Sequence, residues 1–289
     1  MNNGSSPLTI PLTIANLPLL LQGTDEAVIA RLRQRYQDFL APEPIDPLFT
    51  VDINVIPDAI FVEPKPGPWV IESTYTADSM TYRSYVSQSR LDLKTKRGQL
   101  DMAPDASIEN FLRVTYAWLC LQHDGLLLHS AGIIRNELGY VFFGPSGAGK
   151  TTTTRISAKL GTVVSDDLVI IRRLNGQYHL FGVPFRGDLA DEAPRTNSVA
   201  PLKAIFRLRQ DYHHEVAPLP RSMGIAELLA AAPFVSDKRA LTPQLISVCT
   251  DIARHVPLQS LHFKRDDGFW KVIDEHFTEI STTTPANSR

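Results

Sequence analysis

The sequence predicts an α/β fold built on a mixed sheet, and three observations support this. An apolar run at residues 140–143 leads into a glycine-rich loop, and residues 150–160 after the loop have helical character. Asn175-Gly176 separates two apolar runs, which is the signature of a two-residue β-hairpin. Residues 135–138 predict a second hairpin connection just before the loop. Hairpins beside a strand–loop–helix unit favour a sheet that mixes antiparallel and parallel pairs.

The chain of 289 residues is long enough for one large or two modest domains. Residues 1–105 are predicted to form a smaller α+β region of unknown role. Residues 106–280 contain the glycine-rich loop and are predicted to form the main domain. The polar residues 281–289 are expected to be a disordered tail.

The individual elements follow from hydrophobic periodicity and from glycine and proline punctuation. In the first region we expect a helix at 25–40 and strands at 49–56, 59–62, 69–72 and 82–86. In the main domain we expect a buried helix at 107–122, strands at 126–134, 139–143, 168–174, 177–183 and 204–208, and helices at 150–160 and 242–256.

The charge balance argues against two classes of partner. Lys and Arg number 29 against 31 Asp and Glu, which gives a formal net charge of −2. Proteins that bind nucleic acid or anionic membranes normally carry a basic excess, so neither partner is expected. Cys120 and Cys249 lie in apolar surroundings and predict two reduced, buried thiols. Together with the lack of a signal-peptide pattern or an apolar run of membrane length, this predicts a cytoplasmic protein.

The loop carries the strongest chemical signal in the chain, because it matches the pattern G-x-x-x-x-G-K-[ST] without a gap. A chance match in a chain of this length has a probability of roughly 1%. Glycines allow successive N–H groups to converge on an anion, and the following helix adds the positive end of its dipole. Lys150 is predicted to reach the β- and γ-phosphates, and the Thr151 hydroxyl to bind Mg²⁺. The predicted nucleotide-binding residues are Gly144, Pro145, Ser146, Gly147, Ala148, Gly149, Lys150, Thr151 and Thr152.

Two adjacent acids, Asp166 and Asp167, interrupt an otherwise apolar run at residues 163–171. Because burying an unpaired carboxylate is costly, we expect both acids at a strand end that faces the phosphates. The alternative is a turn in which Asp166 accepts backbone N–H groups. Upstream, His129 lies in an apolar strand, where it is either a hydrogen-bonded core residue or part of the site.

The order His129, loop 144–151 and Asp166-Asp167 resembles the catalytic domain of HPr kinase/phosphorylase. It is still more similar to the HPr kinase-related P-loop kinases of peptide-biosynthesis clusters. The similarity runs over residues 126–277, with weaker support at 183–187, 200–206 and 269–273. It implies the P-loop kinase core of the HPr kinase and phosphoenolpyruvate carboxykinase type, with 106–280 as the catalytic domain.

The resemblance also implies roles for individual residues. Lys150 and Thr151 would hold ATP phosphates and Mg²⁺, and Asp167 would be the metal-directed acid. Asp166 resembles the general base that takes the proton from an acceptor serine, and His129 the histidine beside the reacting phosphates. Arg186 would neutralise charge on the transferred phosphoryl group, an effect worth about 10³ to 10⁵ in rate elsewhere.

Two departures from the family pattern limit what the resemblance implies. Pro184 stands where the HPr enzymes have a glutamate that assists metal binding, which puts a second metal site and a reverse reaction in doubt. The N-terminal region does not resemble their regulatory domain, so HPr itself is not inferred as the substrate.

The leading functional hypothesis is an ATP-dependent kinase that phosphorylates a hydroxyl, most simply a serine of a small protein or peptide. A nucleotide-binding switch or assembly module with little catalysis is one alternative, and a small-molecule or carboxykinase-like kinase is another. The preference for ATP over GTP, the formation of a homo-oligomer and the role of the N-terminal third stay open. Arg207 and Arg209 alternate on a strand and either line the acceptor site or lie on an exposed face.

Overall fold

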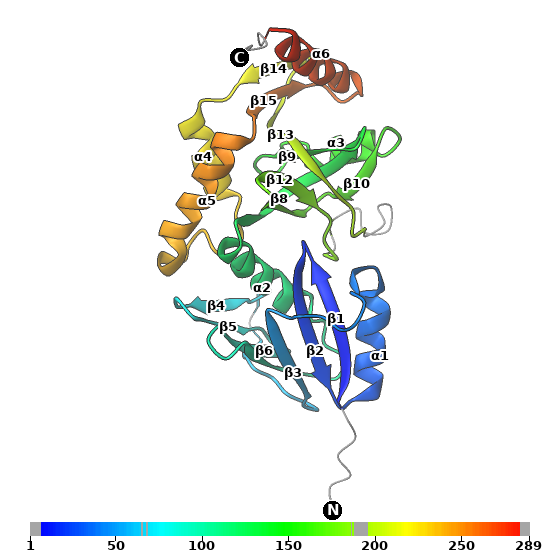
Figure 1. Ribbon diagram of the computed structural model, residues 1–289, viewed down its shortest axis with the longest axis vertical. Coiled ribbons are helices and arrows are strands. Elements are labelled where there is room, and N and C mark those ends of the chain that lie inside the picture. The colour runs from blue at the N-terminus through cyan, green and yellow to red at the C-terminus, as the bar shows by residue number, and fades with distance from the viewer. Residues whose placement is uncertain (1–6, 65, 68, 186, 188–195, 284–289) are drawn as a thin grey trace, which may run out of the picture.

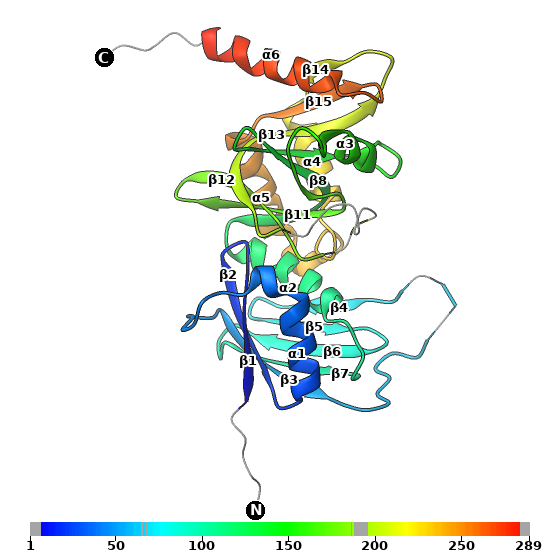
Figure 2. The same cartoon turned by 90° about the vertical axis from the view of Figure 1, so that its right-hand side faces the viewer.

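The computed structural model describes residues 7–283 apart from positions 65, 68, 186 and 188–195. Within these residues, two sheets lie one above the other along the long axis of the molecule (Figure 1). Helix α2 (Glu109–Gln122) lies between them, and the same arrangement is visible from the side in Figure 2. The predicted helix at 107–122 is confirmed, and Ser107 accepts a hydrogen bond from the Glu109 N–H at 3.2 Å near its start.

The N-terminal sheet combines hairpins with parallel pairs in the order β1-β2-β3-β7-β6-β5-β4. Strand β3 runs parallel to both β2 and β7, whereas the other neighbours are antiparallel. Residues 59–62, which were expected to form a strand, do not, because prolines flank this short apolar run. The strands are β1 (Leu8–Ile14), β2 (Leu17–Gly23), β3 (Phe49–Val55), β4 (Glu72–Tyr75), β5 (Ser79–Arg83), β6 (Ser87–Asp92) and β7 (Arg97–Met102).

Helix α1 (Glu26–Arg35) confirms the helix expected at 25–40, although it ends earlier. The Asp25 carboxylate caps it by accepting a hydrogen bond from the Val28 N–H at 2.9 Å. Its apolar side, Val28, Ile29 and Leu32, is buried against the first two strands. Arg35 in its last turn points toward α2, which matters for the site described below.

The second sheet is mixed, as predicted. Its order is β10-β8-β11-β12-β13-β15-β14, and β9 pairs with both β8 and β13. Strands β9 and β15 run parallel to β13, and the remaining pairs are antiparallel. The strands are β8 (Gly125–Arg135), β9 (Leu138–Phe143), β10 (Thr162–Ser165), β11 (Leu168–Leu174), β12 (Gln177–Phe181), β13 (Val199–Gln210), β14 (Glu215–Pro218) and β15 (Leu258–Phe263).

Strand β9 lies between two hydrophobic cores because its side chains alternate between the faces of the sheet. Val141 and Phe143 join a core shared with α2, the N-terminal sheet and two helices, α4 (Arg221–Ala230) and α5 (Thr242–His255). Tyr140 and Phe142 join a second core with α3 (Lys150–Ser157) and α6 (Gly268–Thr283). The strand that leads into the glycine-rich loop is therefore held rigidly from both sides.

Helix α6 closes the second core. The buried Trp270 donates a hydrogen bond from its indole N–H to Ser157 Oγ at 3.0 Å, which ties α6 to α3. The helix continues to Thr283, three residues into the segment predicted as a disordered tail. The rest of that segment lies outside the described residues.

Helix α2 connects the two halves of the fold through a common core. The fully buried Trp118 lies 6.0 Å from the ring of Phe49 and 6.4 Å from that of Tyr75, both in the N-terminal sheet. Cys120 on α2 and Cys249 on α5 are unpaired and buried, and burial raises the pKa of each thiol to about 12. Among the described helices, none combines the length and the apolar character needed to cross a bilayer.

Candidate functional site

The glycine-rich loop joins the end of β9 at Phe143 to the start of α3 at Lys150, as the sequence predicts. Gly149, the residue before the helix, has φ +110°, a conformation that other residues rarely adopt. A Cβ at this position would lie only 2.6 Å from the ring of Phe263. Both the backbone geometry and the close packing therefore require glycine here.

Hydrogen bonds hold the loop in a closed curl. The Ala148 N–H donates to the Pro145 carbonyl at 3.1 Å, and the Gln210 amide donates to the Gly147 carbonyl at 2.6 Å. The buried Lys150 ammonium donates to the Gly144 carbonyl at 3.0 Å. A cation inside the curl, next to the positive end of the α3 dipole, makes this loop suited to an anion.

Asp166 and Asp167 lie between β10 and β11, two segments that both pair with β8. The register of β10 on β8 shifts between Val163 and Ser165, which is the signature of a β-bulge. Bulges redirect side chains next to functional sites, and here both acids reach the pocket of the glycine-rich loop. Ser165 Oγ accepts hydrogen bonds from the backbone N–H groups of Asp167 and Leu168, each at 3.2 Å. This serine therefore stabilises the turn between β10 and β11.

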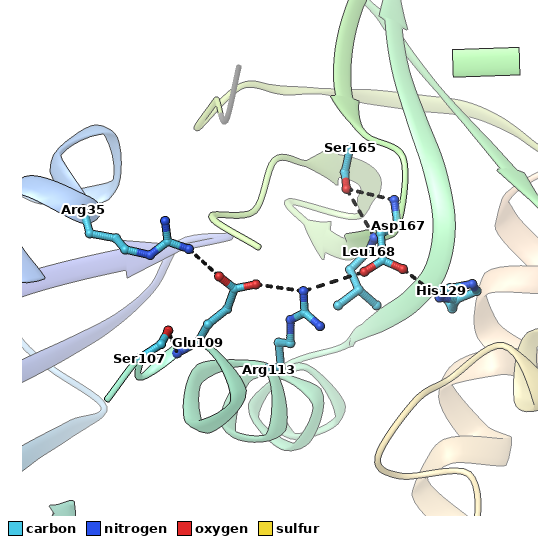
Figure 3. Close-up of polar contacts among 8 residues, drawn as sticks. All are labelled: Arg35, Ser107, Glu109, Arg113, His129, Ser165, Asp167 and Leu168. Carbon is cyan, nitrogen blue, oxygen red and sulfur yellow. Dashed lines mark hydrogen bonds and ion pairs between the residues drawn. The ribbon is translucent and has the colours of Figure 1, made fainter. Parts of the chain in front are cut away.

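Asp167 belongs to a chain of charged contacts that runs from Arg35 on α1 to His129 (Figure 3). Arg35 on α1 pairs with Glu109 on α2, and Glu109 pairs with Arg113 one turn later at 2.8 Å. Arg113 lies 3.7 Å from one Asp167 oxygen, and His129 Nδ1 lies 3.1 Å from the other. Glu109 and Arg113 are only 12% and 20% exposed, so these contacts are weakly screened by solvent.

Replacing Arg113 with methionine should lower the free energy of unfolding by about 1–3 kcal/mol, because Glu109 loses a partner in a half-buried setting. Urea unfolding followed by circular dichroism measures this. Lys94→Met is a matched control in which an exposed pair with Asp78, at 2.7 Å, is removed, and we expect little change in the free energy of unfolding because solvent screens such a pair. An equal decrease in the free energy of unfolding in the two variants would show that the Arg113 contacts stabilise the fold no more than an exposed ion pair does.

Gly187 packs directly against the acid pair. A Cβ there would lie 2.0 Å from Asp166 Oδ1 and 2.9 Å from Asp167 Cβ. The segment that precedes it, through the buried Val183 and Phe185, approaches the acids from the side of Arg113, whose guanidinium lies 5.7 Å from the ring of Phe185. Arg186 itself lies outside the described residues.

Gly187→Ala should therefore displace Asp166 and reduce any activity that depends on this carboxylate by about 10²-fold, the cost of a misplacement of about 1 Å. Gly176→Ala is the matched control, because a Cβ there meets nothing within 4 Å, although the turn residue has φ +85°. The control should lose a little stability and retain its activity. If both variants stay fully active, close packing at Gly187 does not matter.

One pocket of about 450 Å³ brings most of the predicted site together. It is lined by His129, Ser146, Gly147, Gly149, Lys150, Thr151, Thr152, Asp166, Asp167, Gln210 and Arg265. Of the predicted nucleotide-binding residues, Gly144, Pro145 and Ala148 do not line it. Gly144 and Pro145 instead border a neighbouring pocket, and Ala148 packs against the second core.

His129 lies on the exposed side of its strand rather than in the core, since half of its side chain is accessible. Sequence reasoning missed Glu109, Arg113, Gln210 and Arg265. A charged pair four residues apart, Glu109 and Arg113, on an otherwise apolar helix was the signal that could have identified two of them.

The residues present suit Mg²⁺. The Thr151 hydroxyl and the Asp167 carboxylate line the same pocket, and Mg²⁺ prefers such oxygen donors. Within the described residues, no group of three His, Cys, Asp or Glu side chains is arranged to hold a metal by itself.

By fold and site, the chain falls in the class of α/β proteins that carry a glycine-rich strand–loop–helix element in a mixed sheet. More particularly, the family described as SynChlorMet cassette protein ScmC matches residues 106–278, and the chain belongs to this family.

Among solved structures, the chain is similar to the HPr(Ser) kinase/phosphatase from Coxiella burnetii, with a TM-score of 0.30 and 8% identity. The match covers 54% of this chain and 98% of that one. At this TM-score the link to HPr kinases is loose. No curated protein matches the sequence.

Proposed function

We propose that the protein is an ATP-dependent kinase that transfers the γ-phosphoryl group to a hydroxyl, most simply that of a serine in a peptide or small protein. One observation carries the proposal. Lys150 and Thr151 of the glycine-rich loop line the same pocket as Asp166, Asp167 and His129. Phosphoryl transfer requires neutralised phosphates and an oriented hydroxyl, and this pocket supplies groups for both.

In the proposed reaction, the acceptor oxygen forms a bond to the γ-phosphorus while the bond from this phosphorus to the β,γ-bridging oxygen breaks. ADP leaves, and the acceptor proton passes to Asp166. Lys150 and the N–H groups of the loop hold the phosphates, and His129 lies beside the reacting end of the pocket. Mg²⁺, held by Thr151 and Asp167, would neutralise developing phosphate charge when bound.

The Asp167–His129 pair is a second candidate for the general base. Asp167 is 3.1 Å from His129 Nδ1, an arrangement that orients the imidazole and leaves Nε2 to accept a proton. We assign the base to Asp166 because it is a buried carboxylate that lines the pocket, with 5% exposure. At the position of the second metal-directed acid, the side chain of the buried Pro184 offers no ligand atom, so we propose no reverse reaction.

The proposal is tested with the purified full-length chain, ATP labelled at the γ-phosphate, Mg²⁺, and pools of peptides centred on Ser, Thr or Tyr. We expect label transfer to the serine pool, and its loss when EDTA removes the metal. A pool of small hydroxylated metabolites run in parallel separates a peptide kinase from a small-molecule kinase.

Each result decides between functions. Nucleotide binding without any phosphorylated product would identify a switch or assembly module and contradict the proposed kinase. Transfer to metabolites alone would move the acceptor to the small-molecule class. We also propose a cytoplasmic location, because the reaction consumes ATP and both cysteines are unpaired thiols.

A further inference from the structure

A second pocket, of about 480 Å³, adjoins the pocket that holds the acid pair. The two sets of lining residues have His129 and Ser146 in common. Neither Lys150 nor Thr151 lines the second pocket, which instead borders the beginning of the loop at Gly144 and Pro145. The two pockets therefore meet at His129 and Ser146, and His129 contacts Asp167 at 3.1 Å.

The second pocket is built for a mainly apolar ligand. Phe143, Ala230, Ala231 and Pro233 contribute to its walls. Its charged groups, Arg207 and Glu227, form an ion pair with Nε and Oε1 2.6 Å apart. Pockets of this kind bind apolar groups, and a few placed polar atoms fix the orientation of the ligand. Of the two alternating arginines, Arg207 thus lines a pocket and Arg209 lies exposed.

The wall of this pocket is fixed to the reaction centre through the backbone. The His129 N–H donates to the Ala231 carbonyl at 2.8 Å, and the Ala231 N–H donates to the Glu227 carbonyl at 2.9 Å. The end of α4 is therefore attached to the strand that carries His129. A group bound against Ala231 lies at a fixed position relative to His129 and the acids.

The position of the pocket indicates which reactant enters it. In a loop of this pattern the backbone holds the α- and β-phosphates and the lysine reaches the β- and γ-phosphates. The phosphates of the bound nucleotide are therefore expected to lie along Lys150, Thr151 and Thr152. None of these residues lines the second pocket. The attacking hydroxyl must approach the γ-phosphate near Asp166 and His129, and His129 also lines the second pocket.

We propose that the second pocket binds an apolar side chain of a peptide acceptor, next to the residue that carries the phosphorylated hydroxyl. This inference rests on the proposed kinase function and adds a substrate class to it. Burial of one large apolar side chain favours such a substrate about 10- to 100-fold over one with a charged neighbour. The Arg207–Glu227 ion pair also lines this pocket and would lie beside the bound apolar side chain.

The test uses labelled ATP and serine-centred peptide pools that differ only in the flanking residues, either Leu and Phe or Asp. The wild-type chain should phosphorylate the apolar pool with a kcat/KM at least about 10-fold higher. Ala230→Trp, at an exposed position on the rim, should fill the pocket and remove this preference. The affinity for a fluorescent ATP analogue should stay unchanged.

Ala226→Trp is the matched control, because Ala226 is exposed on the same helix and does not line the pocket. Ala230→Asp adds a second variant, which should shift the preference toward pools flanked by Lys and so cannot be mimicked by misfolding. A loss of ATP-analogue affinity in Ala230→Trp would assign the pocket to the nucleoside instead. Equal rates for all pools would overturn the inference and leave the kinase intact, whereas no transfer to any pool would overturn both.

Discussion

Lys150→Ala should reduce kcat/KM for ATP by about 10²- to 10³-fold, since truncating one partner of a buried charge pair costs about 2–5 kcal/mol. Lys150 is buried within the loop and donates to the Gly144 carbonyl at 3.0 Å. Its ammonium thus already lies where phosphate oxygens are proposed to bind. Steady-state kinetics with labelled ATP, together with titration of a fluorescent ATP analogue, measures the loss in turnover and in binding.

Lys159→Ala is the matched control. Lys159 is exposed just beyond α3, so its removal changes the net charge by the same amount without touching the pocket. It should retain wild-type kinetics. An ATP-analogue affinity that is the same in Lys150→Ala and in the wild type would mean that the loop does not bind phosphate, and the proposed function would fail with it.

The sequence predicted elements well where a local signal determines them. The hairpin at Asn175-Gly176 is confirmed, with φ of +48° and +85° at its two turn residues, because this conformation favours Asn and Gly. The glycine-rich loop between β9 and α3 is also confirmed, because Gly144, Gly147 and Gly149 adopt positive φ angles that favour glycine. The mixed character of the sheet followed from these local features.

The N-terminal sheet was predicted less well, because its strands contain residues that usually interrupt strands. Pro11 lies in β1, a strand that we did not predict from the sequence. It is tolerated there because β1 is the first strand of the sheet order, where a missing N–H costs least. Pro18 similarly stands at the second position of β2. Position in the sheet, which is a tertiary property, decided both cases.

The two acids and His129 were expected in one site from their order along the chain, and they line one pocket. Their contact partners were not expected. Arg113 reaches Asp167 from a helix that is distant in sequence, and Arg35 is linked to it through Glu109. No local pattern encodes such contacts, since they depend on how α1 and α2 pack. The same holds for Gly187, whose constraint comes from the proximity of Asp166 in space.

Asp166→Asn should lower kcat by about 10²- to 10⁴-fold, the usual contribution of general base catalysis, with ATP-analogue affinity unchanged within about 3-fold. The amide has nearly the same shape as the carboxylate, so packing against Gly187 is retained while the proton acceptor is lost. Single-turnover transfer of labelled phosphate to a serine peptide isolates the chemical step from product release. Asp38→Asn, at an exposed position in the N-terminal half, is the control and should be neutral.

His129→Asn provides the decisive comparison for this prediction. His129 contacts Asp167 at 3.1 Å and is half exposed, so its loss should weaken the placement of Asp167 and reduce kcat less than Asp166→Asn does. If His129→Asn instead abolishes transfer while Asp166→Asn stays close to wild type, the base is the Asp167–His129 pair. In that case Asp166 would have a structural role beside Gly187, and Arg113 would act on the base itself through its contact with Asp167.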